Sequence, residues 1–255
     1  MTSLFDFLES PKPRKCGRPR TYTLDEHALD ALTPDSCYVL GFLMADGYIV
    51  RKSDRAVEGI GFALAAEDYE QLDAIRRFFK SNAPIRNLIL KDTRPGWENI
   101  QPQKTLYLYS RALAERAMQH GIKPAKSPDA KATSEIVASP YFKDFVRGVM
   151  DGDGSLYWGR HRPNHGGFPA MSLCGAKPLM EQFAAFVRQH VPGCVAKVWP
   201  AMNIWSVKVQ GTFAQRLAFV LYDGCAMALP RKLAKARELI AAHIRPQYGR
   251  KRAWQ

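Results

Sequence analysis

The chain has 255 residues, of which 46% are hydrophobic, so it can bury a sizeable core and a disordered protein is excluded. Lysine and arginine total 37 against 24 acidic residues, and the formal net charge of +13 favours a polyanionic partner. Because no apolar run approaches the ~20 residues of a membrane-spanning helix and five scattered cysteines form no C-x-x-C pair, we expect a cytoplasmic protein without a membrane span or disulfide framework.

Residues 11–20, PKPRKCGRPR, are rich in proline and basic side chains and predict an extended basic arm. Within this arm, the segment GRPR (17–20) resembles the core of an AT-hook, whose extended arginines lie in a narrow minor groove. The resemblance implies DNA contacts by Arg18 and Arg20, and a solvated linker is the alternative.

A strong helix signal follows the arm. Thr33 can cap a helix that begins at Pro34, since threonine suits the N-cap and proline suits the first helical position. Residues 38–45 are almost all apolar, which predicts a helix that is buried on most sides. Gly47 supplies the stop of this helix.

The chain then predicts two strands, a helix, two more strands and another helix. Polar turn residues separate the expected strands, and the expected helices carry apolar residues at intervals of three and four. In chain order, we expect strands at 48–52 and 57–65, a helix at 68–80, strands at 85–91 and 104–109, and a helix at 111–120.

A similar series begins again after residue 130. Ser139-Pro140 predicts a second capped helix by the same N-cap and first-position logic, and this helix runs to Gly154. We then expect strands at 155–159 and 170–174, a helix at 179–189, strands at 195–199 and 204–209, and helices at 213–222 and 231–243.

The order helix–strand–strand–helix–strand–strand–helix therefore occurs twice, and Asp46 and Asp153 stand about one repeat length apart. We predict an α+β fold of two αββαββα units with antiparallel strands, related by a pseudo-two-fold axis. The expected segments are a basic arm over residues 1–32, a first repeat over 33–130, a second repeat over 134–246 and a basic tail over 247–255.

Both leading helices carry the same pattern at their ends. Each has a glycine five residues before its final acid, Asp46 or Asp153, and another glycine directly after that acid. A second small residue stands four positions after the first glycine, and small residues four apart on one face let two helix backbones approach closely. We therefore predict that the helices pack together and present both acids side by side at their C-terminal ends. The residues that we expect at this contact are Gly41, Ala45, Gly148 and Gly152.

Two carboxylates at neighbouring helix C-termini are unfavourable, because they repel each other and face the negative end of each helix dipole. A divalent cation would relieve the repulsion, and oxygen ligands suit a hard ion such as Mg²⁺, or another divalent cation such as Mn²⁺. A metal held by two aspartates beside a phosphodiester can activate water and stabilise the leaving oxygen. A single Asp-Gly at a helix end is commonly just a cap, so the prediction depends on the pair.

The segments LGFLMADGYI (40–49) and RGVMDGDGSL (147–156) resemble the two motifs of the single-chain LAGLIDADG homing endonucleases. The order of expected elements fits that family from residue 33 to residue 243. The resemblance implies that Asp46 and Asp153 are the metal-binding catalytic acids. It also implies β-saddles that straddle double-stranded DNA, a long recognition site, and hydrolysis of both strands across the minor groove.

The first motif departs from the family pattern at one auxiliary position. The family often carries a further acid two positions before the metal-binding one. Asp151 holds this position in the second repeat, whereas Met44 replaces it in the first. Because two repeats in one chain already form the pseudo-dimer, we expect a monomer.

The resemblance further implies basic residues near the metal. The segments HGIKPAKS (120–127) and MALPRKLAK (227–235) lie at equivalent ends of the two repeats. Lys126 and Lys232 are therefore the candidates for stabilising charge on the phosphate or for orienting water. A phosphate or surface contact is the alternative for both lysines.

A sheet that faces DNA should alternate long polar side chains with buried anchors. Arginine and lysine can pair with guanine, asparagine with adenine, and all of them with phosphate. The candidates in the first repeat are Tyr48, Arg51, Lys52, Arg86, Asn87, Lys91, Tyr107 and Tyr109, and those in the second are Tyr157, Arg160, His161, Arg162, His165, Lys197, Trp199, Asn203, Trp205 and Lys208.

The sequence favours a site-specific DNA endonuclease, because a pure binding protein has no need of two adjacent carboxylates. One alternative is a non-cleaving protein of the same fold, such as an intron maturase or a transcriptional regulator. Another is a basic structural RNA-binding protein, which would leave the duplicated motif unexplained.

Overall fold

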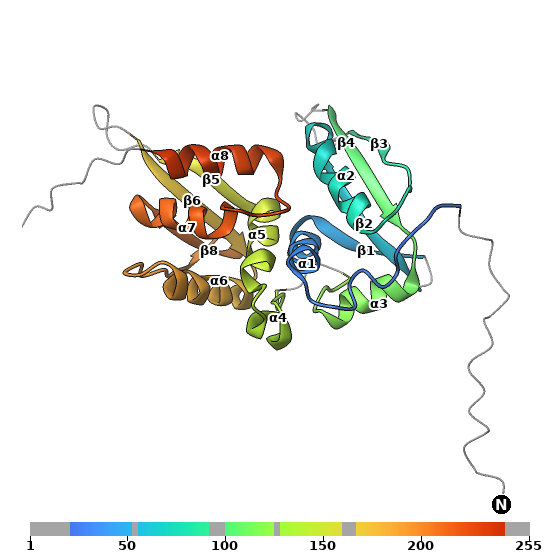
Figure 1. Ribbon diagram of the computed structural model, residues 1–255, viewed down its shortest axis with the longest axis horizontal. Helices are drawn as coiled ribbons and strands as arrows, with labels where there is room; N and C mark the ends of the chain where they lie inside the picture. The colour runs from blue at the N-terminus through green and yellow to red at the C-terminus, as the bar shows by residue number, and fades with distance from the viewer. Residues whose placement is uncertain (1–20, 53–55, 92–99, 125–127, 160–166, 243–255) are drawn as a thin grey trace, which may run out of the picture.

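The computed structural model describes residues 21–52, 56–91, 100–124, 128–159 and 167–242. Two halves of similar architecture lie side by side, and helices α1 (Pro34–Asp46) and α5 (Phe142–Asp153) meet between them (Figure 1). Within these described ranges, every helix is too short or too polar to cross a membrane.

The two halves repeat the same series of elements, with short additions. After α1, the first half contains β1 (Gly47–Arg51), β2 (Val57–Ala65), the 3-10 helix η1 (Ala66–Asp68), α2 (Tyr69–Phe78), β3 (Arg86–Lys91), β4 (Ile100–Leu108) and α3 (Arg111–Gln119). The second half contains α4 (Ser134–Ala138), α5, β5 (Gly154–Gly159), β6 (Phe168–Gly175), α6 (Lys177–His190), β7 (Val198–Ala201), β8 (Ile204–Gln210), α7 (Thr212–Tyr222) and α8 (Pro230–Ala241).

Each half forms one four-stranded antiparallel sheet. The strand order is β1-β2-β4-β3 in the first sheet and β5-β6-β8-β7 in the second. Strands β1 and β5 follow the two central helices without an intervening residue. The predicted α+β fold with a duplicated αββαββα order is confirmed.

Alternation along the strands gives each sheet two different faces. The core face carries apolar residues such as Ile60, Phe62 and Leu106, and helices α2 and α3 contact the strands of this sheet. We call the opposite side the distal face. The strand registers place on the distal faces Tyr48, Gly61, Ala63, Arg86, Thr105 and Tyr107 in the first half, and Ser155, Tyr157, Ala170, Ser172, Trp199, Ser206 and Lys208 in the second.

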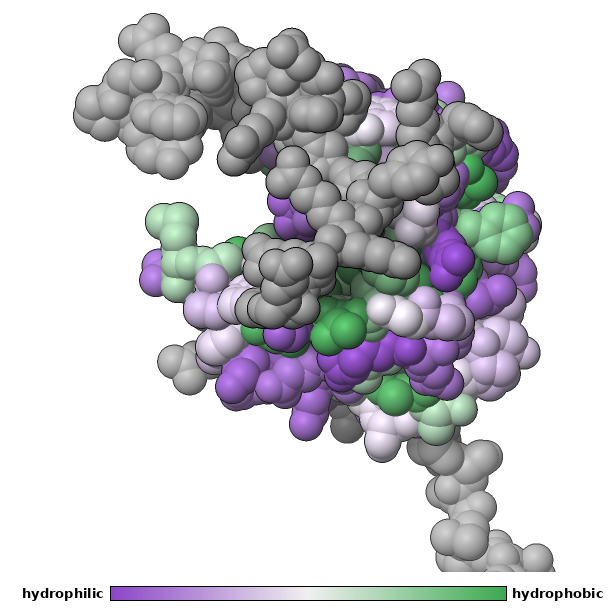
Figure 2. Space-filling model, turned by 90° about the vertical axis from the view of Figure 1, so that its left-hand side faces the viewer, coloured by the Kyte–Doolittle hydropathy of each residue, from purple (hydrophilic) through white to green (hydrophobic). Residues whose placement is uncertain are grey.

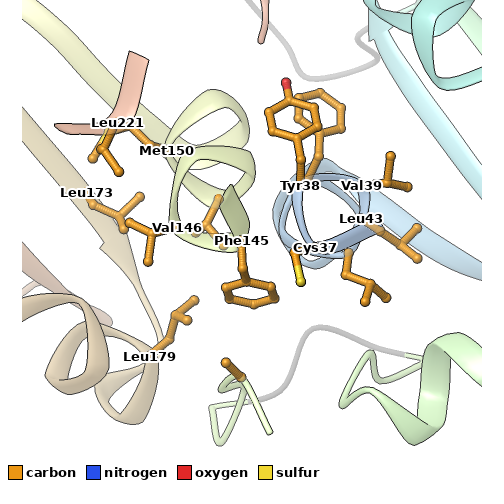
Figure 3. Packing of buried hydrophobic residues seen from close by; sticks show 14 of the residues in the cluster. Cys37, Tyr38, Val39, Leu43, Phe145, Val146, Met150, Leu173, Leu179 and Leu221 are labelled. Carbon is orange, nitrogen blue, oxygen red and sulfur yellow. The ribbon is translucent and has the colours of Figure 1, made fainter. Parts of the chain in front are cut away.

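A single cluster of buried apolar side chains runs through both halves. Tyr38 and Leu43 of α1 belong to it together with Phe145 and Met150 of α5, and Figure 3 shows these side chains around the two adjoining helices. Figure 2 shows the side of the second half that points away from the first, where hydrophilic residues predominate and hydrophobic ones are scattered between them.

The beginning of α1 follows the sequence prediction. Thr33 is the N-cap, its side chain accepts from the Ser36 N–H, and the Ser36 hydroxyl accepts from the Thr33 N–H, which completes a capping box. Pro34 occupies the first helical position. The cap therefore satisfies backbone donors that the first helical turn leaves without intrahelical partners.

The predicted beginning of the second central helix is wrong. Ser139 does not open α5 but closes the short helix α4, since its N–H and its hydroxyl both donate to the Ile136 carbonyl. Helix α5 begins at Phe142, and its N-cap Tyr141 makes no side-chain capping bond. A serine beside a proline serves either end of a helix, and here it terminates the preceding one.

The described residues before α1 pack on the first half. Leu29 is fully buried, and the Asp25 N–H donates to the Phe79 carbonyl at the end of α2. The Arg116 guanidinium of α3 donates to Asp30 at 2.8 Å. This segment therefore helps to fix α2 and α3 against the start of α1.

Candidate functional site

Helices α1 and α5 approach each other at backbone-to-backbone distance. A methyl group at Gly41 would lie 2.1 Å from the Phe145 carbonyl oxygen, and one at Gly148 would lie 2.1 Å from the Tyr38 carbonyl oxygen. Real Cβ atoms do not occupy such positions, so this crossing requires glycine on both helices. The glycine-directed packing that the sequence suggested is therefore present between Gly41 and Gly148.

The contact continues to the C-terminal ends of both helices. A methyl group at Gly152 would lie 2.3 Å from the Ala45 Cβ atom and 3.3 Å from the Asp46 Oδ2 atom. The Asp46 carboxylate thus lies beside the residue that precedes Asp153. The structure brings the two acidic helix ends together at the seam between the halves.

The two acids occupy matching positions in their helices. Asp46 is half-buried and Asp153 is exposed, and each is the last residue of its helix. The N–H of Gly47 donates to the Leu43 carbonyl, and the N–H of Gly154 donates to the Met150 carbonyl. Each glycine is also the first residue of a strand, so the helix ends and the sheets are fixed to each other.

Lys232 caps the end of α5 from within the protein. Its side chain is buried, and its Nζ atom donates to the carbonyls of Met150, Asp151 and Gly154 at 2.8, 2.5 and 2.7 Å, and to that of Gly152 at 3.2 Å. A positive charge at a helix C-terminus complements the helix dipole. The predicted lysine therefore lies next to Asp153, with its ammonium group directed at backbone carbonyls.

Burial disfavours the positive charge of Lys232, and nearby carboxylates favour it. Burial lowers the pKa of Lys232 to about 8, although the carboxylates of Asp151, Asp46 and Asp153 each favour the charged form. One ammonium group is thus within electrostatic reach of the acids of both repeats. This reach is a second sign that Asp46 and Asp153 share one environment.

Asp151 joins three helices through one buried carboxylate. It is fully buried and accepts from the Tyr38 hydroxyl of α1, the Tyr222 hydroxyl of α7 and the Leu229 N–H that precedes α8, each at 2.7 Å. Burial raises the pKa of Asp151, and these three hydrogen bonds oppose that rise. Asp151 therefore fixes the start of α8, and with it Lys232, against the central helices.

An ion pair that the sequence did not predict joins the two halves. The Arg231 Nε atom donates to the Asp68 carboxylate at 2.9 and 3.2 Å, so α8 of the second half is bonded to η1 of the first. The Asp68 side chain is 6% exposed and that of Arg231 is 54% exposed. The only sequence signal was the position of Arg231 directly before Lys232 in a basic segment.

Two pockets open at the two acidic helix ends. A pocket of about 190 Å³ in the first half is lined by Met44, Asp46, Tyr48 and Lys123 among others. An open pocket of about 580 Å³ in the second half is lined by Gly154, Ser155, Leu156, Tyr157, Ser172, Arg231, Lys232 and Lys235. The second pocket is the larger and is lined by three basic residues.

Several predicted DNA-contacting residues lie on the distal faces. Tyr48 and Tyr107 stand opposite Gly61 in neighbouring strands, and the Tyr107 ring stacks on that of Tyr109 with centroids 5.9 Å apart. The Lys208 ammonium group lies 5.7 Å from the centroid of the Tyr157 ring. Arg86 and Trp199 also lie on these faces, and further candidates exposed at strand ends or turns are Arg51, Lys52, Lys197 and Asn203.

Two predicted contacts lie on the other side of the sheets. The Asn87 side chain accepts from Lys104, whose ammonium group lies over the Tyr69 ring of α2. Trp205 packs against the core, and the Lys177 ammonium group of α6 lies 4.8 Å from its ring centroid. The strand register turns both side chains toward the helices and away from the distal face. Neither residue therefore lies on the distal face, and contact of either with DNA stays a prediction.

The remaining predicted residues lie outside the described ranges. These residues are Arg18, Arg20, Lys126, Arg160, His161, Arg162 and His165. Lys91 lies at the end of β3, where its backbone pairs with that of Ile100.

The acidic helix ends fit a hard divalent cation. Asp46 and Asp153 supply carboxylate oxygens, and within the described ranges no group of three or more His, Cys, Asp or Glu side chains gathers around a common point. Mg²⁺ is commonly held by one or two carboxylates, with water and phosphate completing its shell. The carboxylate oxygens of Asp46 and Asp153 are therefore of the ligand type that Mg²⁺ prefers.

Comparison of the sequence with models of known families and with curated proteins finds no match. The fold, however, is similar to solved structures of homing endonucleases. The homing endonuclease I-WcaI bound to its DNA recognition sequence has a TM-score of 0.54 and 14% identity, over 83% of this chain and 87% of that one. The I-SmaMI LAGLIDADG homing endonuclease bound to cleaved DNA has a TM-score of 0.51 and 14% identity, over 82% and 88%. Mesophilic variants of the homing endonuclease I-DmoI have a TM-score of 0.52 and 11% identity, over 84% and 99%.

Proposed function

Because the chain has the fold of the single-chain LAGLIDADG homing endonucleases, we propose that it is a site-specific endonuclease that cuts both strands of double-stranded DNA. The similar structures of I-WcaI and I-SmaMI, each bound to DNA, support this proposal. The observation that carries it is the pair of aspartates, Asp46 and Asp153, at the ends of two helices packed backbone to backbone. A protein that only bound DNA would gain nothing from placing two carboxylates there.

Asp46 and Asp153 would hold Mg²⁺ or another divalent cation such as Mn²⁺. When bound, the ion would supply Lewis-acid stabilisation of the negative charge that develops on the phosphate. The chain's own contribution is position. The glycine contacts fix the distance between the helices, and Lys232 secures the last turn of α5 beside Asp153. Lys126, which lies outside the described residues, would stabilise charge on the phosphate or orient water in the first repeat.

The distal faces would contact the duplex on either side of the acids. Their tyrosines, serines, Arg86 and Lys208 offer hydrogen bonds and stacking surfaces, and the net charge of +13 attracts phosphate. Two sheets in one chain would span a long recognition site as a monomer. The arginines of the arm, Arg18 and Arg20, would add minor-groove contacts.

The test is cleavage of a DNA duplex in which the two sequences that flank the encoding gene are placed directly next to each other. The duplex and a randomised duplex library are incubated with the protein in Mg²⁺ or in EDTA. Double-strand cleavage is expected in Mg²⁺ alone, because two carboxylates without the cation cannot stabilise the phosphate charge.

Asp46→Asn and Asp153→Asn should each lower double-strand cleavage by roughly 100-fold or more, while leaving duplex affinity nearly unchanged. Asp35→Asn, at the opposite end of α1, is the matched control and should cut normally. Normal cleavage by both Asp46→Asn and Asp153→Asn would show that the catalytic residues are wrongly assigned. Duplex binding without cleavage by the wild type would instead indicate the non-cleaving function.

A further inference from the structure

We propose that Arg231 binds a backbone phosphate of the DNA duplex at the seam between the halves. Asp68 of the other half holds the Arg231 side chain in the orientation that this contact requires. This inference rests on the proposed function, since it requires that the chain bind DNA. Beside the two acids, it adds a phosphate-binding arginine and the aspartate that positions it. It also explains what the ion pair between the halves would do.

The ion pair leaves part of the arginine able to donate elsewhere. The Nε atom of Arg231 bonds to Asp68, and a guanidinium carries five N–H donors in a planar fork. More than half of the side chain is exposed, whereas Asp68 is almost fully buried. The buried carboxylate therefore anchors the Nε edge of the fork, and the terminal nitrogens of this side chain, which is 54% exposed, would bind a second acceptor.

The exposed part of Arg231 lines the larger pocket beside Asp153. The pocket begins at Gly154, directly after that acid, and the serines Ser155 and Ser172 of the distal face also line it. Arginine forks match the geometry of phosphate oxygens and bind them in a bidentate manner. A phosphate in this pocket would meet Arg231 and two chain hydroxyls next to the acidic seam.

The other two cations of the pocket are already engaged. The Lys232 ammonium group donates to four backbone carbonyls, and the Lys235 ammonium group bonds to Glu238 at 2.5 Å. Arg231 is thus the basic residue of this pocket whose exposed donors best suit an incoming anion. In sequence, Pro124-Ala125-Lys126 corresponds to Pro230-Arg231-Lys232, so alanine stands where the second repeat has the arginine.

A role in neutralising acids is the competing explanation. Asp68 raises the pKa of the Arg231 guanidinium, and Glu67 and Asp46 add to this effect. If Arg231 only neutralised these carboxylates, its removal would change stability and leave the dependence of DNA binding on salt unchanged. The two explanations therefore differ in a binding measurement that needs no cleavage.

The experiment measures binding of a fluorescein-labelled 30-bp duplex of mixed sequence, in EDTA, over a series of KCl concentrations. Each phosphate contact contributes about 0.9 to the slope of log affinity against log salt. Arg231→Gln should reduce that slope by about 0.9 and weaken binding several-fold, and Arg231→Lys should give an intermediate loss. Thermal melts establish that each variant is folded.

Asp68→Asn separates positioning from charge. This variant removes a negative charge, so electrostatics alone predicts tighter binding to DNA. If Asp68 orients Arg231, the variant should instead bind more weakly than the wild type. The matched controls are Arg111→Gln and Glu115→Gln, which make the same charge changes in an exposed Arg–Glu pair of α3 with an Nε–Oε1 distance of 2.7 Å.

A reduced slope in Arg231→Gln but not in Arg111→Gln, together with weaker binding by Asp68→Asn, supports the inference. A wild-type slope in Arg231→Gln, or tighter binding by Asp68→Asn, overturns it while leaving the proposed endonuclease standing. If the wild type does not bind the duplex at all, the proposed function fails and the inference fails with it.

Discussion

At the scale of single residues, Lys232 combines two opposing effects. Burial disfavours its charge, while four backbone carbonyls at the end of α5 accept hydrogen bonds from its ammonium group. Asp151 acts from the other side, because it fixes the residue before α8. The side chain beside the second acid is thus held by contacts within the protein before any ligand arrives.

The lowered pKa of Lys232 predicts a pH dependence of stability. Its folded pKa of about 8 lies below the ordinary value of 10.5, so between these values the unfolded chain binds more protons than the folded one. The contribution of this lysine to the free energy of unfolding should therefore rise with pH, by roughly 1 kcal/mol from pH 7 to pH 9. Urea unfolding of the wild type and of Lys232→Met at both pH values gives this contribution as their difference. A difference that stays flat or falls would contradict the prediction.

At the scale of elements, the crossing of α1 and α5 depends on Gly41 and Gly148, because glycine has no side chain to keep the two backbones apart. Gly148→Ala should lower the free energy of unfolding by about 3 kcal/mol or more, because its methyl group would overlap the Tyr38 carbonyl oxygen and the Phe42 nitrogen. Gly175→Ala is the control, since its nearest neighbour is the flexible end of Met180 at 3.3 Å. Urea denaturation compares the two variants, and equal losses would show that the close approach is not needed.

Elements with strong local signals could be predicted from the sequence. Thr33 and Pro34 begin α1 as expected, and the strand expected at residues 57–65 is β2. The cap assigned to Ser139 was wrong because α4 has five residues, too few to show a helical period. A short helix and a helix start then look alike in sequence.

The candidate site could be predicted only in part. Asp46 and Asp153 could be identified from a local pattern, because each ends an apolar helix, has a glycine five residues before it and is followed directly by another glycine. The pair formed by Arg231 and Asp68 joins residues 163 positions apart, and no local pattern encodes such a contact. The faces occupied by Asn87 and Trp205 depend on strand register, and a shift of one residue reverses a side chain's face.

At the scale of the whole molecule, the two halves share one apolar interior. Side chains of both α1 and α5 belong to a continuous buried cluster, so neither half can lose its packing without exposing the other. We therefore expect one unfolding transition in differential scanning calorimetry, with calorimetric and van't Hoff enthalpies that agree. Two resolved transitions would mean that the halves unfold independently.

The direct passage from each acid into a strand has a consequence for redesign. Asp46 and Asp153 are followed at once by the first residues of β1 and β5, with no flexible link between them. In a nuclease built this way, the backbone sets the offset between the bases that are read and the bonds that are broken. Under the proposed function, exchanging side chains on the two sheets would therefore retarget cleavage to another sequence, while the stagger of the two cuts stayed the same.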